Sequence, residues 1–340
     1  MTASPFWIIA GAFGVSLIAT GLMRRYALRE NLLDVPNSRS SHLLPTPRGG
    51  GLAIVLAFSV ALIAAAIVTK FNARLLSALL VGGGAIGCIG FVDDHRSVPA
   101  VLRLSVHVLA ALFAVLLLGG IPEAALAGWG VNGDYVAIAI AVVALVWATN
   151  LFNFMDGIDG IAGTEVVFVS IAGAWLNWQA GGDSTLTTAT LCLAAASAGF
   201  LCWNWPPARI FMGDVGSGFI GFVIAVLGLT ISQRGTVPIE VWLILGGVFV
   251  VDASVTLIRR VFRGDRWFEA HRTHAYQHLA QRWKSHVAVT LSVAAINFIW
   301  LLPWAWLATR NPTHALWFLT AALTPLVVLA LAFGAGRRKH

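Results

Sequence analysis

Two adjacent carboxylates, Asp93 and Asp94, stand in the segment GFVDDHRS (90–97), directly after a long apolar run. If that run is a helix, its carboxyl end places both charges where they oppose the helix macrodipole and repel each other. Structure alone gives no reason for such a pair, whereas a bound divalent cation would supply one. A solvated loop edge beside His95 and Arg96 is the alternative interpretation.

A third acidic group, Asp214, lies in RIFMGDVGSGF (209–219), directly before another apolar run. Asp214 could be a simple helix N-cap. The flanking glycines Gly213, Gly216 and Gly218 nevertheless resemble a backbone cradle for an anion or a metal-bound phosphate. We therefore treat Asp214 as a candidate metal ligand.

The segment NLFNFMDGIDG (150–160) carries four amide or carboxylate side chains at a spacing of three, namely Asn150, Asn153, Asp156 and Asp159. On an α-helix each step of three turns the chain through about 300°, so the four groups form a polar strip on one side. A helix cap is the alternative interpretation, but capping requires one such residue and not four. The strip is predicted to line a binding site.

Two further segments complete the set. RRVFRGDRWFEAHRTHAYQHLAQRWK (259–284) contains seven cations and three histidines. Arginine forks suit phosphate groups, and histidine can donate or accept a proton near neutral pH. For any single arginine, attraction to anionic lipid headgroups is the alternative. The second segment, SRSSHLLPTPRGGG (38–51), is rich in proline and glycine.

The elements that must position these residues cross a membrane. Of the 340 residues, 58% are hydrophobic and 11% are charged, with a mean hydropathy of +0.82, whereas a soluble domain is about 25% charged. A run of about 18 apolar residues can cross the hydrocarbon core as a helix. We predict an all-α integral membrane protein with about eleven such spans, at 5–23, 49–69, 74–92, 100–119, 134–152, 160–178, 185–203, 216–232, 237–258, 286–307 and 314–334.

The basic residues set the orientation that we predict. Of the 22 lysines and arginines, 18 fall on one side of this topology, and such an excess marks the cytoplasmic side. We expect a periplasmic N-terminus, a cytoplasmic C-terminus and one polytopic domain over 1–340 that includes the basic loop 259–285. The net charge of +7 then reflects topology, and no nucleic-acid partner is expected. All five acids of the first three segments fall on the cytoplasmic face, where we place the active site.

Two more acids, Glu165 and Asp252, lie several residues inside predicted spans. An ionisable group at depth in a membrane is a functional hypothesis by default, although both could lie near enough to the interface to be hydrated. Paired carboxylates with an arginine- and histidine-rich loop on one face describe a site for a divalent metal and a phosphorylated substrate. Mg²⁺ prefers this combination of carboxylate and phosphate oxygens, and the chemistry indicated is phosphoryl transfer.

The segments FVDDHRS, NLFNFMDGIDGIAG, FMGDVGSGFIGF and the histidine-containing loop occur in this order along the chain. This order resembles the polyprenyl-phosphate N-acetylhexosamine-1-phosphate transferase superfamily, glycosyltransferase family 4. DVPNSRSSHLLPTPRGGG (34–51) is similar to the bacterial branch that starts O-antigen and related surface glycans. The resemblance covers residues 24 to 284. It implies transfer of an N-acetylhexosamine or 6-deoxy-N-acetylhexosamine 1-phosphate from a UDP-sugar to undecaprenyl phosphate, with release of UMP, in the bacterial inner membrane.

The resemblance also implies roles for individual residues. Asp214 and Asp94 would hold Mg²⁺, with Mn²⁺ as an alternative, and Asp93 would deprotonate or orient the lipid phosphate. Direct one-step displacement and a two-step route through an aspartyl intermediate both stay open. A homodimer in the bilayer is a further expectation. The other implied site residues are His274 for catalysis, and Asn153, Asp156, Asp159, Phe211, Arg272 and Arg48 for substrate binding, with Phe211 stacking on uracil.

The chain departs from the family pattern in two places. Some relatives have a third aspartate after the pair, where this chain continues HRSV, and others have His-x-His in the last loop, where this chain has His274 followed by Ala275 and Tyr276. Two other functions are alternatives. A phosphotransferase acting on CDP-alcohols expects Asp-Gly-x-x-Ala-Arg, which is absent after Asp159. A transporter of a phosphorylated substrate expects a site near the bilayer midplane and internal repeats, and the sequence shows neither.

Overall fold

The computed structural model describes residues 5–36, 44–131, 133–265 and 271–337, and almost all of its regular structure is helical. Ten continuous helical segments within the described residues are long and apolar enough to cross a membrane, and one bent pair of helices makes an eleventh span. The prediction of an all-α polytopic membrane protein with about eleven spans is therefore confirmed. Which terminus faces which compartment stays a prediction.

The spans follow one another with short connections. Two of them contain a π-helical turn, η1 (Ala78–Gly82) and η2 (Asn297–Leu301), within an otherwise continuous helix. The spanning elements are α1 (Pro5–Arg29), α2 (Gly51–Val68), α3 (Ala73–Ser77) with η1 and α4 (Gly83–His95), α5 (Ala100–Leu118), α7 (Asp134–Met155), α8 (Ile161–Gln179), α9 (Ser184–Asn204), α10 (Asp214–Gln233), α11 (Ile239–Leu245) with α12 (Gly247–Phe262), α14 (His286–Ile296) with η2 and α15 (Leu302–Arg310), and α16 (Ala315–Ala332) after the 3-10 turn η3 (Pro312–His314). The connecting elements are β1 (Leu33–Asp34), β2 (Thr46–Pro47), α6 (Glu123–Gly128) and α13 (Ala275–Trp283).

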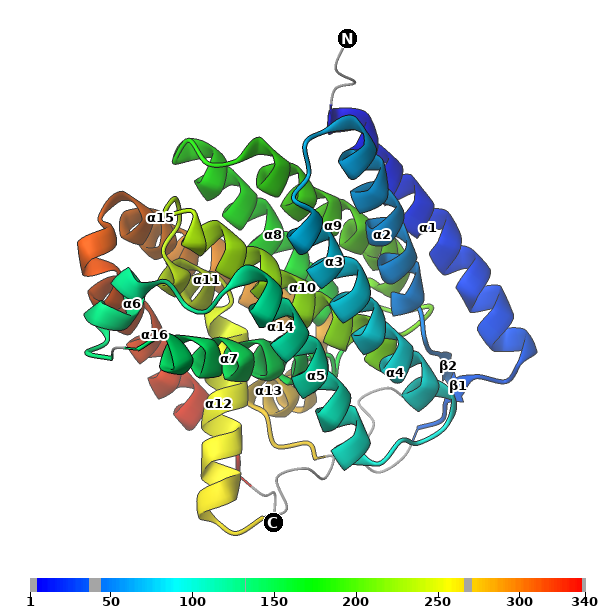
Figure 1. Cartoon of the computed structure of the whole chain (residues 1–340). Coiled ribbons are helices and arrows are strands. Elements are labelled where there is room, and N and C mark those ends of the chain that lie inside the picture. The colour runs from blue at the N-terminus through cyan, green and yellow to red at the C-terminus, as the bar shows by residue number, and fades with distance from the viewer. Residues whose placement is uncertain (1–4, 37–43, 132, 266–270, 338–340) are drawn as a thin grey trace.

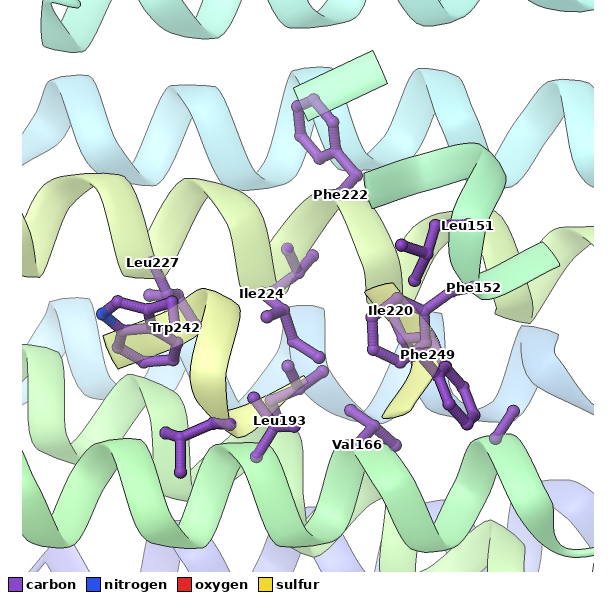
Figure 2. Packing of buried hydrophobic residues seen from close by; sticks show 14 of the residues in the cluster. Leu151, Phe152, Val166, Leu193, Ile220, Phe222, Ile224, Leu227, Trp242 and Phe249 are labelled. Carbon is purple, nitrogen blue, oxygen red and sulfur yellow. The ribbon is translucent and has the colours of Figure 1, made fainter. Parts of the chain in front are cut away.

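Helix α10 runs through the middle of the bundle (Figure 1) and is the most deeply buried of the spans. Figure 2 shows its side chains Ile220 and Phe222 among residues from α7 and α12. On another side of α10, Gly216 and Gly51 of α2 stack so closely that a Cβ built on Gly51 would collide with the Gly216 Cα. Because dispersion rather than water exclusion drives packing within a membrane, small residues at such crossings favour close contact. The start of α10, where Asp214 lies, is consequently fixed by its neighbours.

The ninth span differs from the prediction of one continuous helix over 237–258. Helices α11 and α12 meet at an angle of 82° across Gly246. Adjacent glycines, here Gly246 and Gly247, are a recognised cause of sharp bends. In Figure 1, α12 runs from the middle of the bundle toward the end of the molecule where α4 finishes and the β1–β2 pair lies.

At that end, two of the predicted motifs run side by side. The strands β1 and β2 form a short antiparallel pair, with Asp34 opposite Thr46. The chain after β2 then pairs with the segment that precedes Asp214: the Pro47 carbonyl accepts from Phe211 N–H at 2.8 Å, and the Gly51 N–H donates to the Met212 carbonyl at 2.8 Å. These hydrogen bonds bring the Pro/Gly-rich loop and the glycine-flanked aspartate together, although about 160 residues separate them.

Candidate active site

Asp93 and Asp214, from the ends of α4 and α10, share one cation. Arg103 of α5 donates from Nη1 to Asp93 Oδ2 at 2.6 Å and to Asp214 Oδ2 at 2.8 Å. The second oxygen of Asp93 accepts from the Val98 N–H at 2.6 Å, and that of Asp214 accepts from Asn153 Nδ2 at 2.9 Å. All four oxygens of the two carboxylates therefore have a donor. Charge-assisted hydrogen bonds of this kind are about twice as strong as neutral ones.

Asp94, beside this pair, is 3% exposed and points at the N-terminus of α10. Its Oδ1 accepts from the Asp214 N–H at 3.0 Å and its Oδ2 from the Val215 N–H at 3.2 Å. A carboxylate at a helix N-terminus satisfies unpaired N–H groups and interacts favourably with the macrodipole. The preceding residue, Gly213, has φ +76°, and a Cβ there would collide with Asp94 Oδ2. Arg103 and the N-terminus of α10 thus offset part of the negative charge of the Asp93–Asp94 pair.

The predicted polar strip over residues 150–160 is divided by the end of α7 at Met155. Asn150 and Asn153 lie on the last turns of the helix, and Asn150 Nδ2 approaches His107 Nδ1 at 3.3 Å. Asp159 lies beyond the helix, where it accepts from the Ala208 N–H at 3.0 Å and lies 3.3 Å from His286 Nδ1. The four side chains therefore surround the site from two sides and do not form a single helical stripe.

Asp156 follows directly after α7, and its carboxylate lies near those of three other aspartates. Its burial, and then the carboxylates of Asp214, Asp94 and Asp159, raise the pKa of Asp156 well above its ordinary value. A group of carboxylates that repel one another attracts a divalent cation. Among the described residues no group of three or more His, Cys, Asp or Glu side chains is arranged to hold a metal ion. Mg²⁺, however, typically takes one or two carboxylates and completes its shell with water and phosphate oxygens, so the residues present fit this ion.

Two cavities open beside these carboxylates. The first, of about 620 Å³, contains three residues predicted to bind substrate, Asp159, Phe211 and Arg272. The second, of about 470 Å³, is mainly apolar and has Arg103, Asn153 and Asp214 at its polar part. The remaining wall of the first is formed by Leu44, Thr46, Pro206, Pro207, Ala208, Ala280, Gln281, Lys284, His286 and Val287, and that of the second by Ile89, Gly90, Ala100, Val101, Leu104, His107, Asn150, Phe154 and Gly218.

The histidine segment is held by Asp252, the acid within the ninth span. Asp252 Oδ1 accepts from the Ala275 N–H at 2.9 Å and lies 3.3 Å from His274 Nδ1, and Oδ2 accepts from the Tyr276 N–H at 3.0 Å. Asp252 therefore binds the first two N–H groups of α13 and also orients the ring of His274, the N-cap residue of that helix. The ring of His274 stacks on Phe154, which lines the second cavity, with centroids 6.4 Å apart. His274 thus lies next to a residue of the second cavity, and its catalytic role stays a prediction.

His271, whose individual role the sequence leaves open, stacks on His274 with centroids 4.9 Å apart. Burial, followed by the charges of His274 and Arg260, lowers the pKa of His271 to about 3. His271 is consequently neutral at physiological pH and contributes an uncharged imidazole to this side of the site.

The other predicted residues have clear positions. Arg48 is half-buried and close enough to Asp94 to stabilise its charge, but it does not line either cavity. Residues 37–43 of the Pro/Gly-rich loop and 266–270 of the basic loop lie outside the described residues. Glu165 is fully buried, accepts from Asn297 Nδ2 at 2.6 Å and joins two spans away from the site. Arg103 and His107, one helical turn apart on α5, are site residues that the sequence did not single out.

The chain is similar to several known proteins. The family model described as Glycosyl transferase family 4 matches residues 75–232. A probable undecaprenyl-phosphate N-acetylglucosaminyl 1-phosphate transferase of Bacillus subtilis (strain 168) is 29% identical over 306 residues, covering 86% of this chain and 82% of the relative. A phospho-N-acetylmuramoyl-pentapeptide-transferase of Shouchella clausii is 31% identical over 271 residues, covering 74% of this chain and 81% of the relative.

A third relative comes from a different bacterial group. The decaprenyl-phosphate N-acetylglucosaminephosphotransferase of Mycobacterium tuberculosis (strain CDC 1551 / Oshkosh) is 29% identical over 318 residues, covering 84% of this chain and 77% of the relative. Two of the three names combine N-acetylglucosamine with undecaprenyl or decaprenyl phosphate, and the third names a phospho-N-acetylmuramoyl-pentapeptide.

Proposed function

Since the chain belongs to glycosyltransferase family 4, the polyprenyl-phosphate N-acetylhexosamine-1-phosphate transferase superfamily, we propose that it transfers a sugar 1-phosphate from a UDP-N-acetylhexosamine to undecaprenyl phosphate. In this reaction an oxygen of the lipid phosphate forms a bond to the β-phosphorus of the UDP-sugar. The bridging bond from that phosphorus to the α-phosphate oxygen breaks, and UMP leaves with the electron pair. The products are undecaprenyl diphosphate-sugar and UMP.

The observation that supports this proposal best is the second cavity, which has Arg103, Asn153 and Asp214 at its polar part. The mainly apolar cavity with a polar end suits an isoprenoid chain that terminates in a phosphate. The first cavity offers Phe211 for stacking on a planar base and Arg272 for a diphosphate. The first cavity has the carboxylate of Asp159 in its wall and the second has that of Asp214, so we propose that the two substrates bind there with their phosphates facing each other, as a direct transfer requires.

Each carboxylate has a distinct proposed role. Asp93 and Arg103 orient the lipid phosphate, Arg103 by its charge and Asp93 by accepting its proton. Asp214 and Asp156 are the proposed ligands of Mg²⁺, which when bound would neutralise the charge of the transferred diphosphate. Both oxygens of Asp94 accept from backbone N–H groups of α10, whereas those of Asp214 accept from the side chains of Arg103 and Asn153. Because a side chain can turn away from a carboxylate and a helix N–H group cannot, we propose that Asp214 binds the metal and that Asp94 positions Asp214.

We further propose a bacterial inner-membrane protein whose site faces the cytoplasm, where the excess of basic residues lies and UDP-sugars are made. The resemblance of residues 34–51 to the O-antigen branch supports a product that enters O-antigen or a related surface polysaccharide.

The test is turnover in membranes that contain the protein. With undecaprenyl phosphate, labelled UDP-N-acetylglucosamine and Mg²⁺, we expect labelled lipid and an equal amount of UMP, and we expect EDTA to abolish both. Asp214→Asn should abolish turnover, whereas Asp183→Asn, at an exposed helix cap on the other end of α9, should leave it unchanged. A panel of UDP-sugars then identifies the preferred donor. Absence of UMP release with every UDP-N-acetylhexosamine would refute the proposal.

A further inference from the structure

The last described residues of the chain turn back from the end of α16 toward the histidine segment. After α16 the Ala335 N–H donates to the Ala330 carbonyl at 2.9 Å, which reverses the chain direction. The Gly336 N–H then donates to the carbonyl of Thr273 at 2.6 Å. Thr273 stands between Arg272, which lines the first cavity, and His274. The C-terminal segment is thus bonded to the backbone between two proposed site residues.

Helix α12 holds this C-terminal segment in place. Arg259 Nη1 donates to the Ala335 carbonyl at 2.8 Å, and Arg263 Nη1 donates to the Gly336 carbonyl at 2.6 Å. Ala335 is fully buried. In Figure 1 the chain after α16 passes beside the far end of α12, in agreement with these contacts. Two consecutive carbonyls are therefore bound by Arg259, in the last turn of α12, and by Arg263, the residue that directly follows α12.

The histidine segment is consequently held by hydrogen bonds on both sides of His274. Asp252 binds the N–H groups of Ala275 and Tyr276, whereas Gly336 binds the carbonyl of Thr273 on the other side of His274. Both supports depend on α12, the first through Asp252 and the second through the two arginines. Thr273 lies outside regular secondary structure, so no helical hydrogen bond would fix its orientation if Gly336 were removed.

We propose that residues 334–337, here called the C-terminal clasp, are a positioning element of the active site that fixes Arg272 and His274 by binding Thr273. The proposal rests on the transferase activity proposed above. The clasp does not touch substrate; it restricts the backbone from which the two side chains extend. Its loss should mainly weaken the binding of the UDP-sugar, because Arg272 lines that cavity, and should spare the binding of the lipid.

The first experiment compares a chain that ends at Phe333 with a control chain that ends at Arg337. Hydrogen exchange of the amides in residues 272–277, measured without substrate, should accelerate about tenfold in the shorter chain, because a lost hydrogen bond changes an equilibrium by about that factor, and should match the full-length protein in the control. Unchanged exchange would overturn the proposal. Since this measurement needs no turnover, it separates the clasp from the proposed function, which an inactive full-length protein would refute instead.

The second experiment keeps the chain intact and replaces both arginines, Arg259→Gln with Arg263→Gln. We expect the KM for the UDP-sugar to rise about tenfold while the KM for the lipid phosphate stays unchanged. Lysine at both positions should reverse at least half of that rise, because each lysine returns the charge and a donor. Arg282→Gln, exposed on α13, removes a charge from the same loop and should change neither constant. A fall in the maximal rate with both KM values unchanged would show that the clasp serves only to keep the protein folded, and would overturn the proposal.

Discussion

The Asp94→Asn variant tests whether the Asp94 carboxylate stabilises the start of α10 or takes part in the reaction itself. The carboxamide of the Asp94→Asn variant keeps one acceptor oxygen but presents an NH₂ group to the second backbone donor, so one buried N–H at the start of α10 loses its partner. An unsatisfied buried donor costs about 2 kcal/mol, and loss of the negative charge at the helix N-terminus costs about 1 kcal/mol more. The expected destabilisation is therefore about 3 kcal/mol.

The assay is thermal unfolding of purified protein in detergent, followed by tryptophan fluorescence. At about 2 °C for each kcal/mol in a chain of this size, Asp94→Asn should lower Tm by about 6 °C. Asp183→Asn is the matched control, because Asn caps a helix as well as Asp does and the single Asp183 oxygen that caps α9 has a counterpart in Asn. An Asp94→Asn protein that is inactive but unfolds at the same temperature as the wild type would refute the assignment of Asp94 as a positioning residue.

Three more predictions concern neighbours of the cluster. Arg103→Gln should lower kcat/KM for the lipid phosphate about 100-fold, because two charge-assisted hydrogen bonds are lost, with partial recovery in Arg103→Lys; steady-state kinetics close to those of the wild type would contradict this role. Gly157→Ala should abolish most turnover, because its Cβ would collide with the Tyr276 hydroxyl oxygen; adding Tyr276→Phe removes that atom and should restore part of the activity, and a double variant no better than the single one would count against the clash. The pKa of His271 is lowered from 6.5 to about 3, so the unfolded chain takes up a proton that the folded chain refuses, and stability should fall as pH decreases through this interval. His271→Gln should flatten this part of a plot of Tm against pH, and an unchanged slope would show that His271 is not the group responsible.

The helical architecture was predictable because the signal for a membrane span is strong and local. Length and hydropathy identify each span independently of its neighbours, and all eleven predicted spans coincide with helices. The bend at Gly246 was not predicted, because hydropathy shows how apolar a segment is but not whether its helix axis changes direction. The Gly246–Gly247 pair is the signal that could have indicated it.

Which acids lie at the site was easier to predict than which hydrogen bonds and ion pairs connect them. Sorting Asp93, Asp156 and Asp214 onto one face followed from topology. In the structure Asp93 and Asp214 share Arg103, and Asp156 lies close enough to Asp214 to be affected by its charge. The partner of each carboxylate depends on contacts between segments about 100 residues apart, such as Arg103 with Asp214. For that reason Arg103 was counted among the basic residues of the topology and not as part of the site.

A functional role for Asp252 stays a prediction, but the structure shows which groups it binds. Its depth in a span indicated function by the general cost of burying a charge. In the structure the bent helix turns Asp252 toward α13, where it binds two backbone N–H groups and His274. The partners of Asp252 depend on the 82° bend between α11 and α12. The sequence around Asp252 does not reveal that bend, so it could not identify these partners.

The single guanidinium between Asp93 and Asp214 also has a kinetic consequence. Folding brings the carboxylates of Asp93 and Asp214 together, and Arg103 is their counter-ion. The acidic cluster is therefore preorganised before any substrate binds. An incoming phosphate can exchange with one carboxylate for the same N–H donors, which replaces one ionic contact by another and leaves no intermediate state in which the arginine is unpaired. Under the proposed function, binding of the lipid phosphate should then require little rearrangement of this cluster.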